Sequence, residues 1–151
     1  KHLTLMGGIM TSTSMTKSDI VFVDTSALYA LFNESDMDHL SAITCMHELT
    51  QNQCSFIISN FIVDEIYTLL LTKVNRSVAL KITEYLISEW VVERISYEDE
   101  QRAMSILKSS KDKSYSYTDS TSFALMERLG IKYAFAFDKH FQQYGLKVFF
   151  H

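Results

Sequence analysis

The sequence predicts an α/β fold: an open, doubly wound parallel sheet with helices on both faces. Two observations support this prediction. Short apolar segments of strand length alternate with longer helical patterns from residue 19 onward, and this order is typical of parallel sheets with right-handed crossovers. The segment 20–23, Ile-Val-Phe-Val, is apolar at every position, as expected of a central strand that is buried on both faces.

Length and composition limit the class of protein. A chain of 151 residues, 47% hydrophobic and 21% charged, is typical of one ordered globular domain. No apolar run in the sequence approaches the roughly 20 residues of a membrane helix. Cys45 and Cys54 lack metal-ligand spacing, which favours a reducing, cytoplasmic location. The net charge of −4 argues against a protein that coats nucleic acid non-specifically, but it is compatible with a nuclease that uses carboxylates.

The first 18 residues differ from the rest of the chain. They are rich in Ser, Thr, Met and Gly and show no sustained apolar pattern. We interpret residues 1–18 as a tag remnant or a flexible arm and assign residues 19–151 to a single domain.

The first half of this domain predicts two strands and three helices. The strand 20–23 is followed by a helix at 27–32. After a polar link at 33–38, a helix at 39–51 places three apolar side chains on one side: Ile43, Met46 and Leu49. The strand 54–58 follows, and Ser59 or Asn60 begins a helix along which residues 66, 69, 70 and 74 have core spacing.

The second half continues the alternation. A helix at 77–88 precedes a strand at 90–95, and Ser96 with Asp99 forms a capping box for a helix at 97–108. Three lysines lie in or next to the polar linker 109–114: Lys108, Lys111 and Lys113. They either guide a phosphate backbone or belong to a solvated loop. Residues 117–119 open a helix that Gly130 ends. A strand at 131–137, a short helix at 139–144 and a strand at 146–150 complete the chain.

Carboxylates stand at the ends of two predicted strands and near the starts of two helices. Asp24 and Asp138 directly follow the strands 20–23 and 131–137, and Asp119 lies in the first turn of its helix. In an open parallel sheet all these positions lie at the carboxyl edge, where ligands bind. Taken alone, Asp24 or Ser26 is equally consistent with a helix N-cap.

Glu65 is the fourth acid. It lies four residues after Phe61 and four before Leu69, on a largely apolar helix face, whereas the neighbouring Asp64 is turned away from that face. A carboxylate on a buried face requires a partner or a cation. The alternative is a frayed first turn in which Glu65 interacts with the helix dipole.

Four acids at one edge repel one another, and each close pair costs about 4 kcal/mol at 4 Å and an effective dielectric constant near 20. A counter-ion is therefore expected. Because the ligands are oxygens and no Cys or His is expected near them in sequence, Mg²⁺ or Mn²⁺ fits best. A water held by such an ion can attack a phosphodiester in line.

The ordered motifs together resemble the PIN-domain ribonucleases, and among them the VapC-like toxins of toxin–antitoxin pairs. The motifs are residues 23–26, Val-Asp-Thr-Ser; Glu65 on the helix after the second strand; residues 117–119, Tyr-Thr-Asp; and residues 137–141, Phe-Asp-Lys-His-Phe, followed by Gly145. The likeness covers about residues 19–150.

This resemblance implies a PIN-like fold and a Mg²⁺- or Mn²⁺-dependent endoribonuclease that hydrolyses RNA. It places Asp24, Glu65, Asp119 and Asp138 in the acidic catalytic quartet, with Asp24, Asp119 and Asp138 as metal ligands. It further implies a homodimer and a cognate antitoxin that covers the cleft. One position departs from the family pattern: many members have Thr or Ser two residues before the last Asp, where this chain has Ala136.

Two other functions remain open from the sequence. A haloacid-dehalogenase-type phosphatase also uses an Asp at the end of the first strand, but it needs a second Asp where this chain has Ser26. The other alternative is a catalytically weak PIN-like scaffold that binds RNA or protein. Ala136 favours the scaffold, and the presence of all four acids argues against it.

Overall fold

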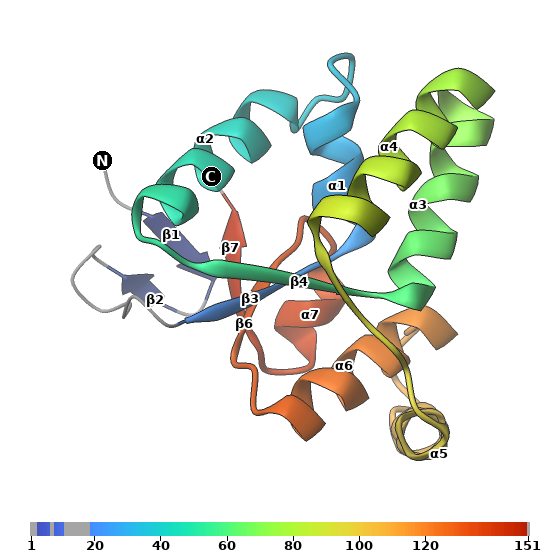
Figure 1. Cartoon of the computed structure of the whole chain (residues 1–151). Helices are drawn as coiled ribbons and strands as arrows, with labels where there is room; N and C mark the ends of the chain where they lie inside the picture. Colours follow the sequence, from blue (N-terminus) through green and yellow to red (C-terminus); the bar gives the residue numbers. More distant parts are fainter. Residues whose placement is uncertain (1–2, 7, 11–18, 151) are drawn as a thin grey trace.

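The computed structural model describes residues 3–6, 8–10 and 19–150, and within them a single mixed sheet forms the centre of the molecule (Figure 1). The described strands lie in the order β2-β1-β7-β6-β3-β4-β5. Their bounds are Leu3–Met6 (β1), Gly8–Met10 (β2), Ile20–Val23 (β3), Ser55–Ser59 (β4), Val91–Glu93 (β5), Tyr133–Phe135 (β6) and Lys147–Phe150 (β7). The five strands from β7 to β5 pair in parallel, which confirms the predicted open parallel sheet.

Helices cover both faces of this sheet, with α1 to α4 above it and α5 to α7 below it in Figure 1. Their bounds are Thr25–Phe32 (α1), His39–Gln51 (α2), Asn60–Lys73 (α3), Arg76–Glu89 (α4), Tyr97–Ser109 (α5), Tyr117–Leu129 (α6) and Lys139–Gln143 (α7). The helix α3 packs on α4, and α5 packs on α6. None of the described helices has the length and apolar character that a bilayer span requires.

The strands β3 and β6 lie side by side at the centre because their side chains are apolar on both faces. Residues 21–23 of β3 are completely buried, and they pair with residues 133–135 of β6. Below the sheet, Phe22 stacks on Phe141, and Phe123 packs edge-on against Phe141 with ring centroids 5.0 Å apart. These aromatic contacts fix α6 and α7 against the strands whose ends carry Asp24 and Asp138.

Local capping sets the starts and ends of the helices that matter for the site. Ser59 Oγ accepts a hydrogen bond from Ile62 N at the start of α3. The helix α6 begins with a capping box between Ser116 and Asp119, and it ends at Gly130, whose φ of 67° is left-handed. Glycine adopts this conformation without a Cβ clash.

The structure differs from the sequence prediction in two apolar segments. On α2 the buried side chains are Ala42, Cys45 and Leu49, whereas the predicted Ile43 is 47% exposed. The last strand before Asp138 is shorter than predicted, because Phe137 N donates to a serine hydroxyl (Ser26 Oγ) instead of to a neighbouring strand.

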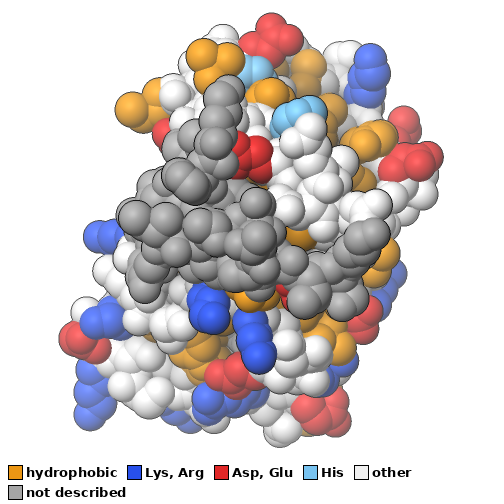
Figure 2. Space-filling view, turned by 90° about the vertical axis from the view of Figure 1, so that its left-hand side faces the viewer, with side chains coloured by type: hydrophobic (Ala, Val, Ile, Leu, Met, Phe, Trp, Pro, Cys, Tyr) orange, Lys and Arg blue, Asp and Glu red, His pale blue; other side chains and the backbone are white. Residues whose placement is uncertain are grey.

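The strands β1 and β2 are an addition to the predicted fold. They pair with each other in antiparallel fashion, and β1 also pairs with β7 in antiparallel fashion. The predicted tag remnant or arm at residues 1–18 falls partly on these strands, and the rest of it, residues 1–2, 7 and 11–18, lies outside the described residues. On the face seen in Figure 2, Lys and Arg side chains are interspersed with acidic ones and do not form one continuous basic surface.

Candidate active site

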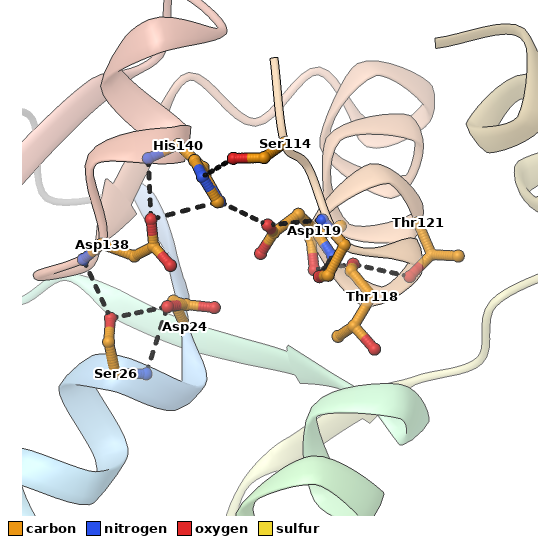
Figure 3. A network of polar contacts seen from close by, with 10 residues as sticks. Asp24, Ser26, Ser114, Thr118, Asp119, Thr121, Asp138 and His140 are labelled. Carbon is orange, nitrogen blue, oxygen red and sulfur yellow. Dashed lines mark hydrogen bonds and ion pairs between the residues drawn. The ribbon is translucent and has the colours of Figure 1, made fainter. Parts of the chain in front are cut away.

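The structure brings the four predicted acids together at the carboxyl edge of the sheet. Asp24 links β3 to α1, Glu65 lies in the second turn of α3, Asp119 in the first turn of α6, and Asp138 caps α7. Charge interactions connect all four: Asp119 and Glu65 raise the pKa of Asp24, and Asp119 and Asp138 raise the pKa of Glu65. Figure 3 shows three of these acids around one centre.

Asp24 is the most buried member of the site, with 4% of its surface exposed. Burial raises its pKa from 3.8 to about 7, and the negative charges of Asp119 and Glu65 add to the rise. Hydrogen bonds from the Ser26 hydroxyl and backbone N–H to Asp24 Oδ2, 2.6 and 3.1 Å long, oppose it. Without a cation, this carboxyl is therefore half protonated near neutral pH.

Ser26 joins two parts of the site that are far apart in the sequence. Its hydroxyl donates to Asp24 and accepts from the backbone N–H groups of Phe137 (2.9 Å) and Asp138 (3.3 Å). From the sequence, Ser26 is a possible helix cap and a member of the Val-Asp-Thr-Ser motif, with no contact to Asp138 expected. In the structure it positions the backbone that carries Asp138, so Ala136, which is buried, does not leave that acid unsupported.

Asp119 and Asp138 are held by helix caps and by His140. Asp119 Oδ2 accepts from Ser116 N (3.0 Å) and lies 2.7 Å from His140 Nδ1. Asp138 Oδ1 accepts from His140 N (2.8 Å) and lies 3.3 Å from the same Nδ1. Through Nδ1, His140 contacts both carboxylates and links the two acids.

His140 is a correction to the expectation that no Cys or His belongs to the site. One of its ring nitrogens, with one carboxylate oxygen each of Asp119 and Asp138, forms a group whose potential ligand atoms all lie within 4.8 Å of one another. Asp24 lies outside that group. The sequence did contain a signal for the contact between His140 and Asp138, because a residue two positions after an N-cap aspartate lies close to that aspartate in the first helical turn.

Glu65 and Asp64 differ in burial, as their positions on the two sides of the helix predicted. Glu65 is partly buried and Asp64 is exposed. Burial raises the pKa of Glu65, and the neighbouring Thr25 hydroxyl opposes this rise. Because Glu65 lies in the second turn of α3 and interacts with three acids of the site, the alternative of a frayed first turn is not needed to explain its position.

The donor set fits a divalent cation. One carboxylate oxygen accepts hydrogen bonds at a helix N-terminus in each of Asp24, Asp119 and Asp138. The second carboxylate oxygen of each of these residues accepts no hydrogen bond within the described part of the chain. Free carboxylate oxygens are the ligands that Mg²⁺ and Mn²⁺ prefer. The two interpretations of these acids, as caps and as site residues, are thus compatible.

The Ser26→Ala variant is expected to destabilise the protein by about 1–3 kcal/mol, because it leaves the N–H groups of Phe137 and Asp138 without their acceptor. A thermal melt with urea titration measures this loss. Ser122→Ala is the control: Ser122 is fully buried, whereas Ser26 is only partly buried, and the Ser122 hydroxyl donates only to the helix carbonyl of Thr118. Equal losses in the two variants would contradict a bridging role for Ser26.

A parallel α/β sheet that gathers four carboxylates at its carboxyl edge, three of them with a free oxygen, defines the class of acidic-site nucleases. The PIN domain family model matches residues 21–147. The chain belongs to the PIN domain family, which confirms the resemblance found in the sequence.

Its relatives include VapC proteins. The chain is 33% identical over 128 residues to the 23S rRNA-specific endonuclease VapC20 of Mycobacterium tuberculosis, and the match covers 83% of this chain and 95% of that protein. The crystal structure of M. tuberculosis VapC20, described as a sarcin-ricin loop cleaving toxin, superposes with a TM-score of 0.76 and 30% identity over 83% of this chain and 95% of that one.

Two more distant structures share the fold. They are VapBC2 from Rickettsia felis bound to a promoter DNA fragment, with a TM-score of 0.67 and 11% identity over 86% of this chain and 98% of that one, and FitAcB from Neisseria gonorrhoeae, with a TM-score of 0.58 and 13% identity over 85% and 96%. At these identities the likeness concerns the fold alone.

Proposed function

We propose that this PIN-domain protein is a Mg²⁺- or Mn²⁺-dependent endoribonuclease and the toxin of a toxin–antitoxin pair. The observation that carries the proposal is Asp24, a buried carboxyl whose pKa is raised to about 7. Its environment of further acids favours a bound cation over an isolated negative charge. The relationship to VapC20, a 23S rRNA-specific endonuclease, supports RNA as the substrate.

Each acid has a separate task in this proposal. Asp24, Asp119 and Asp138 hold the cation through the oxygens that the helix caps leave free. A bound Mg²⁺ or Mn²⁺ supplies charge neutralisation at the phosphodiester and activation of a water for in-line attack. Glu65, whose pKa burial raises, accepts the proton from the attacking water as a general base.

His140 and Ser26 position this set. His140 holds Asp119 and Asp138 together through Nδ1, and Ser26 fixes the backbone of Asp138 relative to Asp24. Because these contacts lock the acids before substrate binds, little reorganisation is needed when charge develops at the phosphate.

The partners follow from the same relationship. The relationship to VapC20, which is described as a toxin, supports a cognate antitoxin for this chain, and we further propose a homodimer. A cytoplasmic location agrees with an RNA substrate and with two cysteines that are both free thiols.

The test is cleavage of 23S rRNA by the full chain with Mn²⁺, with Mg²⁺ and with EDTA, followed by mapping of the new 5′ ends. We expect discrete fragments with metal and none with EDTA or with the Asp24→Asn variant. Identical fragments in EDTA would overturn the metal dependence. Failure to cut ribosomal or any other cellular RNA with either metal would overturn the endoribonuclease assignment.

A further inference from the structure

Two aromatic side chains from different helices stack beside the acidic site. The rings of Phe61 and Tyr117 have centroids 6.0 Å apart and an interplanar angle of 29°. Phe61 lies in the first turn of α3, and Tyr117 is the first residue of α6. This pair therefore joins the N-termini of the two helices that carry Glu65 and Asp119.

The spacing along each helix places the pair close to the acids. Glu65 follows Phe61 by four residues, so the two share one face of α3. Asp119 follows Tyr117 by two residues in the first turn of α6, so its side chain leaves the helix on a different side from the ring. The two rings nevertheless lie at the same N-terminal ends of α3 and α6 as the two acids.

Tyr117 is accessible and its ring is held in place. It is 40% exposed, and among the described residues its single ring contact is the one with Phe61. Its hydroxyl donates to Glu100 Oε1 on α5 at 2.7 Å. A ring held at both ends loses little conformational entropy when a flat ligand stacks on its open side.

The segment that leads into Tyr117 is basic. Lys111 and Lys113 are exposed in the linker between α5 and α6, a few residues before the ring. Lys113 forms an exposed ion pair with Asp112, and such surface pairs are weak enough to open for a phosphate. An exposed aromatic ring beside exposed lysines is a combination that binds single-stranded nucleic acid.

We propose that Tyr117, supported by Phe61, is a stacking platform for one unpaired base of the RNA substrate next to the scissile phosphate. This inference rests on the proposed ribonuclease function and specifies which RNA that site accepts: RNA with an unstacked base, in a loop or a single strand, in preference to a continuous duplex. Stacking tolerates every base, so the platform selects unpaired structure more than sequence.

The experiment measures binding of a short single-stranded RNA that contains one 2-aminopurine, with Mn²⁺ and in the Glu65→Gln background, which keeps the proposed metal ligands. Fluorescence quenching reports stacking of that base. Tyr117→Leu should weaken binding about 10-fold and remove the quenching, because it deletes the ring and retains an apolar side chain. Tyr117→Phe should bind within about 2-fold of the parent, because it keeps the ring.

Tyr85→Leu is the matched control. Tyr85 on α4 is 46% exposed and packs against the ring of Phe32 at a centroid distance of 6.2 Å. Phe32 is the last residue of α1, whereas Asp24 caps the first turn of that helix, so Tyr85 lies at the end of α1 opposite to Asp24. It should leave both affinity and quenching unchanged. Thermal melts of all variants confirm that each remains folded.

The outcomes separate this inference from the proposed function. Equal affinity and quenching in Tyr117→Leu and Tyr85→Leu overturn the platform, even when the wild-type chain cleaves RNA. Loss of quenching in Tyr117→Leu supports the platform, even when the wild-type chain cleaves no RNA. Unchanged RNA binding together with weakened antitoxin binding overturns it in favour of a protein contact.

Discussion

The Asp24→Asn variant is expected to be more stable than the wild-type chain at about pH 8 in EDTA, by up to about 4 kcal/mol. The folded protein holds the pKa of Asp24 at about 7, against 3.8 for the model carboxyl. Between these values the folded state binds a proton that the unfolded state has lost. The contribution of this group to stability is therefore unfavourable above pH 7 and disappears as the pH falls toward 4.

Urea titrations at several pH values measure this effect. Asn keeps the oxygen that accepts the two hydrogen bonds of Ser26, so the α1 cap survives while the charge is removed. The stabilisation by Mn²⁺, which raises the wild-type melting temperature by mass action, should be absent in the variant. Glu34→Gln, at an exposed acid outside the site, is the control and should change neither property. A variant less stable than wild type at every pH would contradict the charge argument.

Glu65→Gln is expected to lower the cleavage rate constant by about 100-fold or more, the usual contribution of a general base. Asp64→Asn should remain within about 2-fold of wild type, because surface changes away from the site have small effects. The two positions are adjacent in sequence and both carry a carboxylate, but α3 turns Glu65 inward and leaves Asp64 exposed.

Single-turnover cleavage at saturating Mn²⁺ measures both variants. The loss in Glu65→Gln should appear in the rate constant and not in the affinity for the metal, because Glu65 is not among the proposed ligands. Similar losses in the two variants would show that α3 presents a different face to the substrate. A loss in Glu65→Gln that excess Mn²⁺ restores would instead make Glu65 a metal ligand.

The fold and the positions of the four acids could be predicted because they depend on local patterns. Apolar strands such as residues 20–23 and capping residues such as Ser96 are short-range signals, and the alternation of elements fixes a parallel sheet. Once the sheet is parallel, Asp24 and Asp138 must lie at one edge whatever the details of packing. Glu65 joins them at this edge because it lies on the apolar face of its helix.

The contacts between these residues could not be predicted, because they depend on distance in space. The hydroxyl of Ser26 bonds backbone groups more than 100 positions away, and His140 reaches Asp119 on another helix. On α2 both Ile43 and Cys45 suit a buried face, and the neighbouring elements decide which of them is covered. The pairing of β1 with β7 is likewise non-local.

The double use of Asp24, Asp119 and Asp138, with one oxygen on a helix cap and one free, restricts how this lineage can lose its activity. Alanine at Asp24 or Asp138, the N-caps of α1 and α7, removes a cap at a cost of about 1 kcal/mol, whereas Asn, Ser or Thr keeps a capping oxygen. Descendants that abandon catalysis but remain folded should therefore accumulate Asn, Ser or Thr at these positions. Inactive homologues in genomes can be recognised by that substitution pattern.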